Sequence, residues 1–247
     1  MSEDALIHVL NKTLGLYQVQ NGFRTSMDSI MLAAACPAKT GETILDLGCG
    51  VGSVGLCVLK RVDNTSLTGI DIQSDHVEIA KKNAALNNMI DRTHFISADI
   101  RKPLEIETFN HVICNPPYKK AGAHKQSESL QKARAMGHIE PDQTLQSWTT
   151  CAWNHIKGQG SLTLVHEANQ IDEIILALYS ENGGRRFGGV EIIPLLPKQD
   201  MPAKRVIIRA YKHKKSPATL HCGFVMHNED GSYTKKADNI LRYAASL

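Results

Sequence analysis

Residues 43–53 constrain the fold of this chain most, because they join an apolar strand to a helix through a turn dense in glycine. They read Thr-Ile-Leu-Asp-Leu-Gly-Cys-Gly-Val-Gly-Ser. Glycine adopts positive φ without strain and lets a ligand approach the backbone closely. The first N–H groups of the following helix, predicted over residues 54–62, favour a carboxylate or a phosphate. The spacing G-x-G-x-G differs from the G-x-G-x-x-G/A of dinucleotide-binding folds.

Acidic residues close the next two predicted strands. Asp71 ends the strand at residues 67–71, and Asp99 follows the strand at residues 93–97. In βαβ nucleotide sites an acid after the second strand accepts hydrogen bonds from ribose hydroxyls. Either acid alone could be a solvated strand end. Three successive strand ends that carry glycine or acid favour one shared binding site instead.

The fourth predicted strand, residues 109–114, runs directly into Asn115-Pro116-Pro117-Tyr118. Two prolines end a strand and stiffen the turn after it, since proline lacks a backbone N–H and restricts the residue before it. A stiff turn lets the Asn115 side-chain oxygen and a neighbouring carbonyl accept both hydrogens of one amino group. The Tyr118 ring offers a face on which a base or an amide can stack. A plain strand-ending turn would explain the prolines but neither Asn115 nor Tyr118.

Together these residues resemble the class I S-adenosylmethionine-dependent methyltransferases. The matching positions are residues 46–52, Asp71 and Asp99, and residues 115–118 resemble the signature of the branch that methylates planar nitrogens. The resemblance implies an α/β, Rossmann-like fold with a seven-stranded, mostly parallel sheet. Its last strand would be antiparallel, and helices would cover both faces.

The resemblance also implies S-adenosyl-L-methionine as the cofactor. Gly48, Gly50 and Gly52 would pass under its methionine part, Asp71 would hold the ribose, and Asp99 with Ile100 would hold the adenine. The predicted cofactor-binding residues are Ser26, Asp28, Asp46, Gly48, Cys49, Gly50, Gly52, Asp71, Ile72, Asp99, Ile100 and Asn115.

The predicted catalytic residues are Asn115, Pro116, Pro117 and Tyr118. By the same resemblance, Asn115 and the Pro116 carbonyl would orient the accepting nitrogen, and Tyr118 would stack on its ring system. Hydrogen bonds from both N–H groups would favour a pyramidal nitrogen with a localised lone pair. The protein then needs chiefly to align nitrogen, methyl and sulfur, and no strong general base is required.

Two flanking segments resemble the valine-tRNA adenine-N6 methyltransferases. One is the lead-in at residues 22–32, in which Ser26 and Asp28 are the matching positions, and the other is the ending at residues 227–234. The resemblance predicts N6-methylation of an adenine in tRNA, namely adenosine 37 of a valine tRNA. The aspartate and glycine of the ending also form a strong turn signal, with a short helix after it.

Basic residues predict contact with RNA. Lys119, Lys120 and Lys125 directly follow the catalytic turn and are well placed to bind phosphates. A solvated loop is the other interpretation of this segment. A second basic segment, residues 198–215, predicts a stripe of positive charge near the sheet edge.

Three other functions stay open at this stage. Methyltransferases that act on glutamine N5 share the Asn-Pro-Pro-Tyr turn, although a larger helical domain usually precedes their cofactor loop. Guanine-N2 enzymes of ribosomal RNA commonly have Phe where Tyr118 stands. From another class, the chain could be a non-catalytic RNA-binding module. Cofactor binding separates this last alternative from the enzymes.

Length and composition indicate the domain organisation and the cellular compartment. The 247 residues suit one α/β domain, with a lead-in at residues 1–41, a catalytic core at 42–211 and a C-terminal hairpin and short helix at 212–247. Apolar stretches are too short to span a bilayer, and the start lacks signal-peptide features. Neither the six cysteines nor the histidines show metal-ligand spacing. We therefore expect a cytoplasmic protein with no bound metal and no membrane contact.

Overall fold

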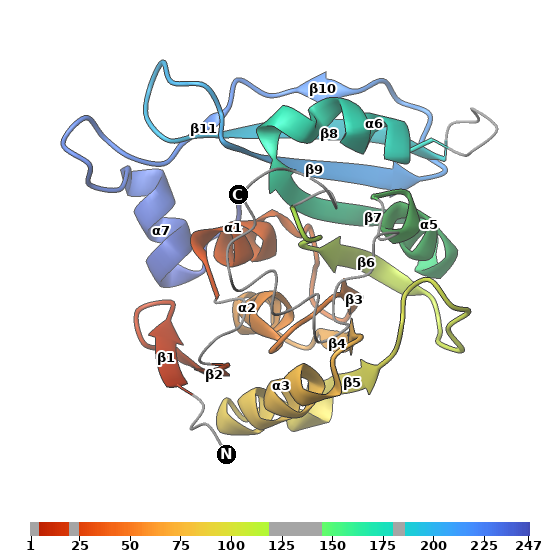
Figure 1. Ribbon diagram of the computed structural model, residues 1–247. Coiled ribbons are helices and arrows are strands. Elements are labelled where there is room, and N and C mark those ends of the chain that lie inside the picture. Colours follow the sequence, from red (N-terminus) through yellow and green to blue (C-terminus); the bar gives the residue numbers. More distant parts are fainter. Residues whose placement is uncertain (1–4, 20–24, 119–144, 180–185) are drawn as a thin grey trace, which may run out of the picture.

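The computed structural model describes residues 5–19, 25–118, 145–179 and 186–247. Its centre is a twisted sheet (Figure 1), which within the described residues has nine strands in the order β10-β8-β9-β7-β6-β3-β4-β5, with β11 also paired to β8. The long strands are β3 (Thr43–Leu47), β4 (Ser66–Asp71), β5 (Thr93–Ser97), β6 (Phe109–Cys114), β7 (Ile156–Glu167), β8 (Phe187–Leu196) and β9 (Arg205–Lys212).

The strand directions confirm the predicted fold class. Strands β5, β4, β3, β6 and β7 are parallel to one another, and β9 runs antiparallel between β7 and β8. The seven predicted strands are extended by β10 (Thr219–Leu220) and β11 (Phe224–Val225), which both pair with β8. An edge strand exposes unpaired backbone groups, and here the chain after β9 returns to cover those of β8.

Helices cover both faces of the sheet (Figure 1). On one face lie α1 (Met27–Ala35), α2 (Ser53–Arg61) and α3 (Ser74–Leu86), with α7 (Lys235–Tyr243) packed against α1. The other face carries α5 (Leu145–His155) and α6 (Ile171–Ala177). Two short 3-10 helices, η1 (Ile90–Arg92) and η2 (Ala168–Gln170), precede β5 and α6.

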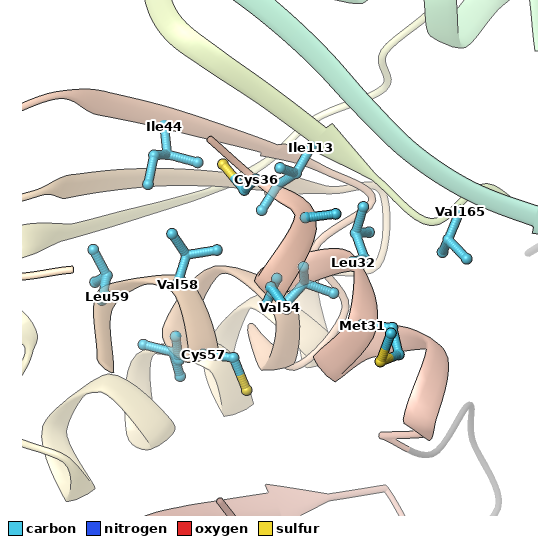
Figure 2. Packing of buried hydrophobic residues seen from close by; sticks show 14 of the residues in the cluster. Met31, Leu32, Cys36, Ile44, Val54, Cys57, Val58, Leu59, Ile113 and Val165 are labelled. Carbon is cyan, nitrogen blue, oxygen red and sulfur yellow. The ribbon is translucent and has the colours of Figure 1, made fainter. Parts of the chain in front are cut away.

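Alternating strand residues supply the two hydrophobic cores. Ile44 and Ile113 pack beneath α1 and α2, as Figure 2 shows, whereas their neighbours Leu45 and Val112 belong to the cluster on the α5 side. Successive side chains of a strand point to opposite faces, so a strand buried on both faces reads as a continuous apolar run. Trp148 of α5 is 5% exposed and belongs to the cluster on the α5 side.

The lead-in contains a hairpin that the sequence did not predict. Strands β1 (Ala5–Val9) and β2 (Leu14–Gln18) pair antiparallel, and β2 packs on α3. Asn83 accepts from the Tyr17 amide at 2.6 Å and donates to the Tyr17 carbonyl at 3.0 Å, and Asn87 bonds Gly15 in the same way. These side-chain amides substitute for a neighbouring strand and hold the lead-in against the sheet domain.

The helix predicted over residues 54–62 is α2, which begins and ends one residue earlier, at Ser53 and Arg61. Helix α3 begins at Ser74, and its cap residue Gln73 makes no side-chain capping bond. Asp71 accepts from the Gln73 amide at 2.9 Å and so shapes the turn before this helix. Within the described residues, α5 begins at Leu145.

The C-terminal turn is confirmed. The Asn228 amide donates to the Ser232 carbonyl at 2.8 Å, and the Thr234 hydroxyl then caps α7 by accepting from the Ala237 amide.

Within the described residues, no helix combines the length and the apolar composition that a membrane span requires.

Candidate active site

The predicted site residues meet at the carboxyl edge of the sheet. Strands β3 and β6 are parallel, with Leu47 opposite Cys114. Gly48 and Asn115 therefore follow neighbouring positions on adjacent strands, which lie about 4.8 Å apart in a sheet. The glycine turn and the Asn-Pro-Pro-Tyr turn are thus side by side, although a long stretch of chain separates them.

The three glycines of the turn all have positive φ, but they face different surroundings. The φ values are +65° for Gly48, +53° for Gly50 and +83° for Gly52. A Cβ on Gly48 would lie 2.5 Å from the ring of Trp148, whereas a Cβ on Gly50 would meet nothing within 4 Å. Gly48 is therefore required by the packing of α5. Gly50 borders open space, which leaves room for a ligand to approach its backbone.

Asp71 ties the turn to the next strand end. Its Oδ2 accepts from the Gly50 amide at 2.8 Å and its Oδ1 accepts from the Gln73 amide at 2.9 Å. The Asp71 carbonyl accepts from Ala98 at 3.0 Å, which links the loop before Asp99. Each carboxylate oxygen has a further lone pair, so Asp71 can still accept from ligand hydroxyls.

Asp46 lies beneath the turn. It is 1% exposed, and its Oδ2 accepts from the Gly55 amide at 3.0 Å. Burial, with a smaller contribution from the charge of Asp71, raises the pKa of Asp46 to about 8. The carboxyl group thus supports the first turn of α2 and is mostly protonated at neutral pH.

Asp99 and Ile100 follow β5 at the same edge. Arg101 donates to Asp99 from Nε at 2.9 Å and from Nη2 at 2.6 Å. These bonds lower the pKa of Asp99, so its carboxylate is charged. Ile100 is buried and Ile72 is exposed. A groove of about 590 Å³ begins at Ile100 and runs along α5.

The Asn-Pro-Pro-Tyr turn is held by a chain of hydrogen bonds. The Tyr118 hydroxyl contacts Asn115 Oδ1 at 2.7 Å and Asp28 Oδ2 at 3.1 Å. Burial, and then the charge of Asp28, raises the pKa of Tyr118, so the hydroxyl keeps its proton and donates it. Asp28 Oδ2 also accepts from Arg205 Nε at 2.9 Å. The carboxylate of Asp28 therefore faces this turn.

The remaining predicted site residues fall into three groups. Ser26 precedes α1, and its Oγ is buried without a hydrogen-bond partner among the described residues. Cys49 and Pro116 are buried within the two turns, whereas Pro117 is exposed. Lys119, Lys120 and Lys125 lie outside the described residues.

Comparison with known proteins identifies the family. The family model described as methyltransferase small domain matches residues 24–179, and this range includes every site residue described above except Arg205. The chain belongs to this family. It is a class I S-adenosylmethionine-dependent methyltransferase, as its sequence motifs predicted.

Individual relatives of this methyltransferase agree. It is 26% identical to the tRNA1(Val) (adenine(37)-N6)-methyltransferase of Vibrio campbellii, over 89% of this chain and 88% of the relative. With the enzyme of the same name from Shewanella halifaxensis the identity is 30%, over 68% and 70%. These matches confirm the resemblance predicted from the flanking segments.

Solved structures confirm the fold. A predicted O-methyltransferase from Agrobacterium tumefaciens superposes with a TM-score of 0.72 at 24% identity, covering 89% of this chain and 98% of its own. For an S-adenosylmethionine-dependent O-methyltransferase from Thermotoga maritima the TM-score is 0.55 at 17% identity, covering 78% and 67%. At these identities the likeness concerns the fold alone.

Two residues that the sequence did not single out, Arg205 and His166, contact Tyr118 at the candidate site. The Arg205 guanidinium carbon lies 4.8 Å from the centre of the Tyr118 ring, and the His166 ring meets Tyr118 edge-on at 5.0 Å. The sequence placed Arg205 in a basic stripe, but its charge faces Asp28, as that of Arg209 faces Glu191. Only the register of β9 could have revealed this.

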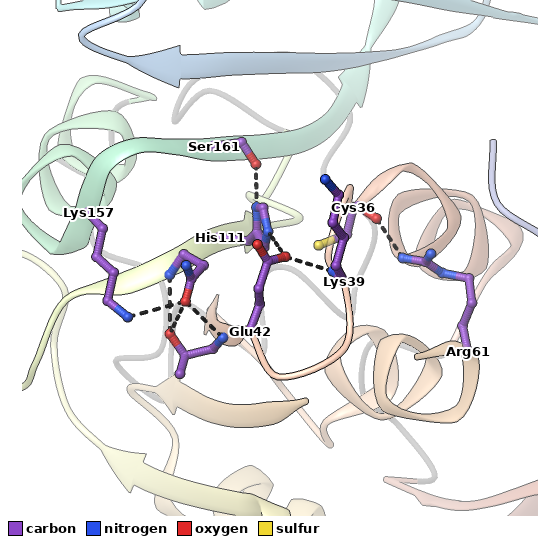
Figure 3. Close-up of polar contacts among 9 residues, drawn as sticks. Cys36, Lys39, Glu42, Arg61, His111, Lys157 and Ser161 are labelled. Atoms are coloured by element: carbon purple, nitrogen blue, oxygen red, sulfur yellow. Dashed lines mark hydrogen bonds and ion pairs between the residues drawn. The ribbon is translucent and has the colours of Figure 1, made fainter. Parts of the chain in front are cut away.

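A second polar cluster lies at the amino edge of the sheet (Figure 3). His111 bonds Glu42 Oε2 through Nε2 and Ser161 Oγ through Nδ1, both at 2.8 Å. This is the connectivity of an acid–base–hydroxyl triad. However, Ser161 is 0% exposed, so its hydroxyl has no access to a substrate and the cluster is structural. Within the described residues, no group of three or more His, Cys, Asp and Glu side chains could hold a metal ion.

Proposed function

We propose that this methyltransferase methylates N6 of an adenine in tRNA, at adenosine 37 of a valine tRNA. The observation that carries the proposal is the placement of Asn115 and Tyr118 beside the glycine turn, with the Asn115 oxygen held by the Tyr118 hydroxyl. The names of the relatives from Vibrio campbellii and Shewanella halifaxensis support the choice of adenine and of tRNA.

The carboxyl edge suits S-adenosyl-L-methionine. The open space at Gly50 would take the methionine part, with Gly48, Cys49 and Gly52 shaping the turn. Asp71 has lone pairs for the ribose hydroxyls, and Asp99 with Ile100 and Ile72 would border the adenine. Ser26 and Asp28 would close the site from the lead-in, and Asp46 would support it from below. When bound, this cofactor supplies a methyl group already activated by a sulfonium.

The catalytic turn would then orient the acceptor amine. A side-chain amide oxygen has two lone pairs, so Asn115 Oδ1 can accept from the Tyr118 hydroxyl and from one amine N–H together. The Pro116 carbonyl would accept the other N–H. The target base would stack on the Tyr118 face turned away from Arg205. No base stronger than these acceptors is needed, because aligning the nitrogen with the methyl group is the main requirement.

Binding of RNA would extend beyond this site. We assign Lys119, Lys120 and Lys125, which follow the catalytic turn in sequence, to contacts with phosphates. We also assign residues 42–211 to the catalytic core and the enzyme to the cytoplasm, where tRNA is available and the six cysteines stay reduced.

The test is incubation with labelled S-adenosylmethionine and unmodified bulk tRNA, followed by mass spectrometry of the digested nucleosides. N6-methyladenosine supports the proposal, and purified valine tRNA should then account for the product. Methylguanosine would preserve the enzyme class but overturn the base. Cofactor binding without any RNA product would direct the search to protein glutamine, the alternative that shares the catalytic turn.

A further inference from the structure

Arg205 reaches the catalytic turn from a strand that runs against the others. It is the first residue of β9, opposite Glu167 of β7 and Leu195 of β8. Because β9 is antiparallel, its amino end lies at the carboxyl edge of the parallel strands. The side chain is therefore delivered to the site by the topology of the sheet.

Arg205 contacts Asp28 and Tyr118 directly, and it is linked to Asn115 through Tyr118. Nε donates to Asp28 Oδ2 at 2.9 Å, and the guanidinium lies over the Tyr118 ring at 4.8 Å from its centre. Nη1 donates to the Lys204 carbonyl at 3.1 Å, which restrains the end of the side chain. The Tyr118 hydroxyl then reaches Asn115 Oδ1 at 2.7 Å.

Two acceptors compete for the hydroxyl proton of Tyr118. The Tyr118 hydroxyl has a single hydrogen but lies within reach of both Asp28 Oδ2 and Asn115 Oδ1. An unpaired carboxylate is the stronger acceptor, because charge-assisted hydrogen bonds are the stronger kind. Arg205 donates to the same Asp28 oxygen and so makes it a weaker acceptor for the Tyr118 hydroxyl. The shorter contact is indeed the one to Asn115.

Donation to Asn115 has a consequence for the reaction. A hydroxyl that donates to a side-chain amide selects the orientation in which the oxygen, and not the NH₂ group, faces it. That oxygen is the acceptor proposed for the substrate amine. With the amide reversed, an NH₂ group would face the amine and no N–H could be accepted there.

We propose that Arg205 is a positioning residue, which holds Asp28 and the Tyr118 ring so that Asn115 presents its oxygen to the acceptor amine. This inference rests on the proposed role of Asn115 but not on the identity of the acceptor. The Arg205 side chain itself touches neither the amine nor the methyl group.

The experiment compares Arg205→Ala and Arg205→Lys with a control at Arg209. Arg209 lies on the same strand, pairs with Glu191 at 3.1 Å and donates to a carbonyl of α1, but it is remote from the catalytic turn. Arg209→Ala therefore removes a similar ion pair without touching the site. All variants are assayed well below their melting temperatures, on whichever acceptor the wild type methylates.

We expect Arg205→Ala to lower kcat roughly 2- to 10-fold, the effect of losing the Tyr118–Asn115 hydrogen bond through which it acts. The Kd for S-adenosylmethionine should stay near that of the wild type. Arg205→Lys should restore part of kcat, because lysine keeps the charge but lacks the planar group that lies over an aromatic ring. Arg209→Ala should lower stability and leave kcat unchanged. Equal kcat losses in the two alanine variants, or a loss confined to cofactor affinity, would overturn the proposal.

A second readout does not depend on activity. The side-chain amide signals of Asn115, identified by NMR as those missing from Asn115→Ala, should be sharp in the wild type and in Arg209→Ala. In Arg205→Ala they should broaden or double. Unchanged signals would refute the positioning role. If the wild type methylated guanine or glutamine, the proposed function would fail, yet both readouts would still decide the role of Arg205.

Discussion

The two ends of strand β6 carry polar clusters of similar build and different use. At the amino end, Glu42, His111 and Ser161 form one hydrogen-bonded chain, and at the carboxyl end Asp28, Tyr118 and Asn115 form another. Each chain runs from a carboxylate through a ring to a smaller polar group. The hydroxyl group of the first, on Ser161, is fully buried, whereas the second borders the glycine turn and open space.

The difference shows that a hydrogen-bonded chain does not by itself make an active site. In a parallel α/β sheet, ligands bind outside the carboxyl ends of the strands, where loops diverge. At the amino end Ser161 is fully buried, so its hydroxyl cannot meet a ligand. Similar chemistry therefore stabilises the fold at one edge and, in our proposal, orients a substrate at the other.

The largest expected effect comes from Asn115→Ala. It should lower kcat about 100-fold or more, the scale seen when one group that acts in the transition state is removed. Affinity for S-adenosylmethionine, measured by calorimetry, should remain. The matched control is Asn110→Ala, which removes the same residue type from the same strand at the amino end, where Asn110 accepts from the Thr43 amide. A near-normal rate for Asn115→Ala would remove the functional contrast between the two edges.

The next largest effect is a loss of stability on substituting His111 at the amino edge. His111→Ala leaves Glu42 and buried Ser161 without their shared partner, which should lower the free energy of unfolding by about 1–3 kcal/mol. Urea denaturation measures this directly. The kcat of the folded variant should equal that of the wild type. A loss of kcat without a loss of stability would mean that the amino-edge cluster takes part in catalysis.

Removing one hydroxyl from each hydrogen-bonded cluster should give smaller effects, on kcat at the carboxyl edge and on stability at the amino edge. Tyr118→Phe keeps the ring but loses the bond to Asn115, so kcat should fall roughly 2- to 10-fold with little change in stability. Ser161→Ala should reduce stability by about 1 kcal/mol and leave kcat alone. Paired kinetic and unfolding measurements on both variants check this. A Tyr118→Phe enzyme with wild-type kcat would show that its hydroxyl does not orient Asn115.

The smallest effect is a dependence of stability on pH. Burial is the main cause that lowers the pKa of His111 in the folded protein. The unfolded state therefore takes up this proton first, and stability should begin to fall as the pH drops through about 6.5, the ordinary value for histidine. His111→Gln should remove that portion of the slope in urea unfolding at several pH values. An identical slope in the variant would contradict the assignment.

The buried carboxyl group of Asp46 should make stability depend on pH in the opposite direction. Its pKa is about 8 in the folded protein, well above that of an unfolded aspartate. Its contribution to stability is fully present below about pH 3.9, the ordinary value for aspartate, and is lost progressively as the pH rises to about 8. Asp46→Asn should flatten this decline between about pH 4 and 8, and the two variants together separate the edges by the direction of their pH dependence.

Local signals were enough for the strands and turns that build the site. The prediction of β6 at residues 109–114 matches the structure, because apolar residues followed by two prolines leave the backbone little choice. The glycine turn was predicted equally well, since three positive φ values require glycine. The hairpin at residues 5–18 was missed, because side chains of α3 stabilise it rather than a local turn signal.

The sequence by itself determined the fold class, the order of strands and helices, and the residues at the carboxyl edge, because these depend on backbone preferences within a few residues. The tertiary structure alone decided which polar groups meet. Arg205 and Asp28 are 177 residues apart and are joined by the register of an antiparallel strand. The same packing buried Ser161 and left Gly50 beside open space, and burial depends on everything that surrounds a residue.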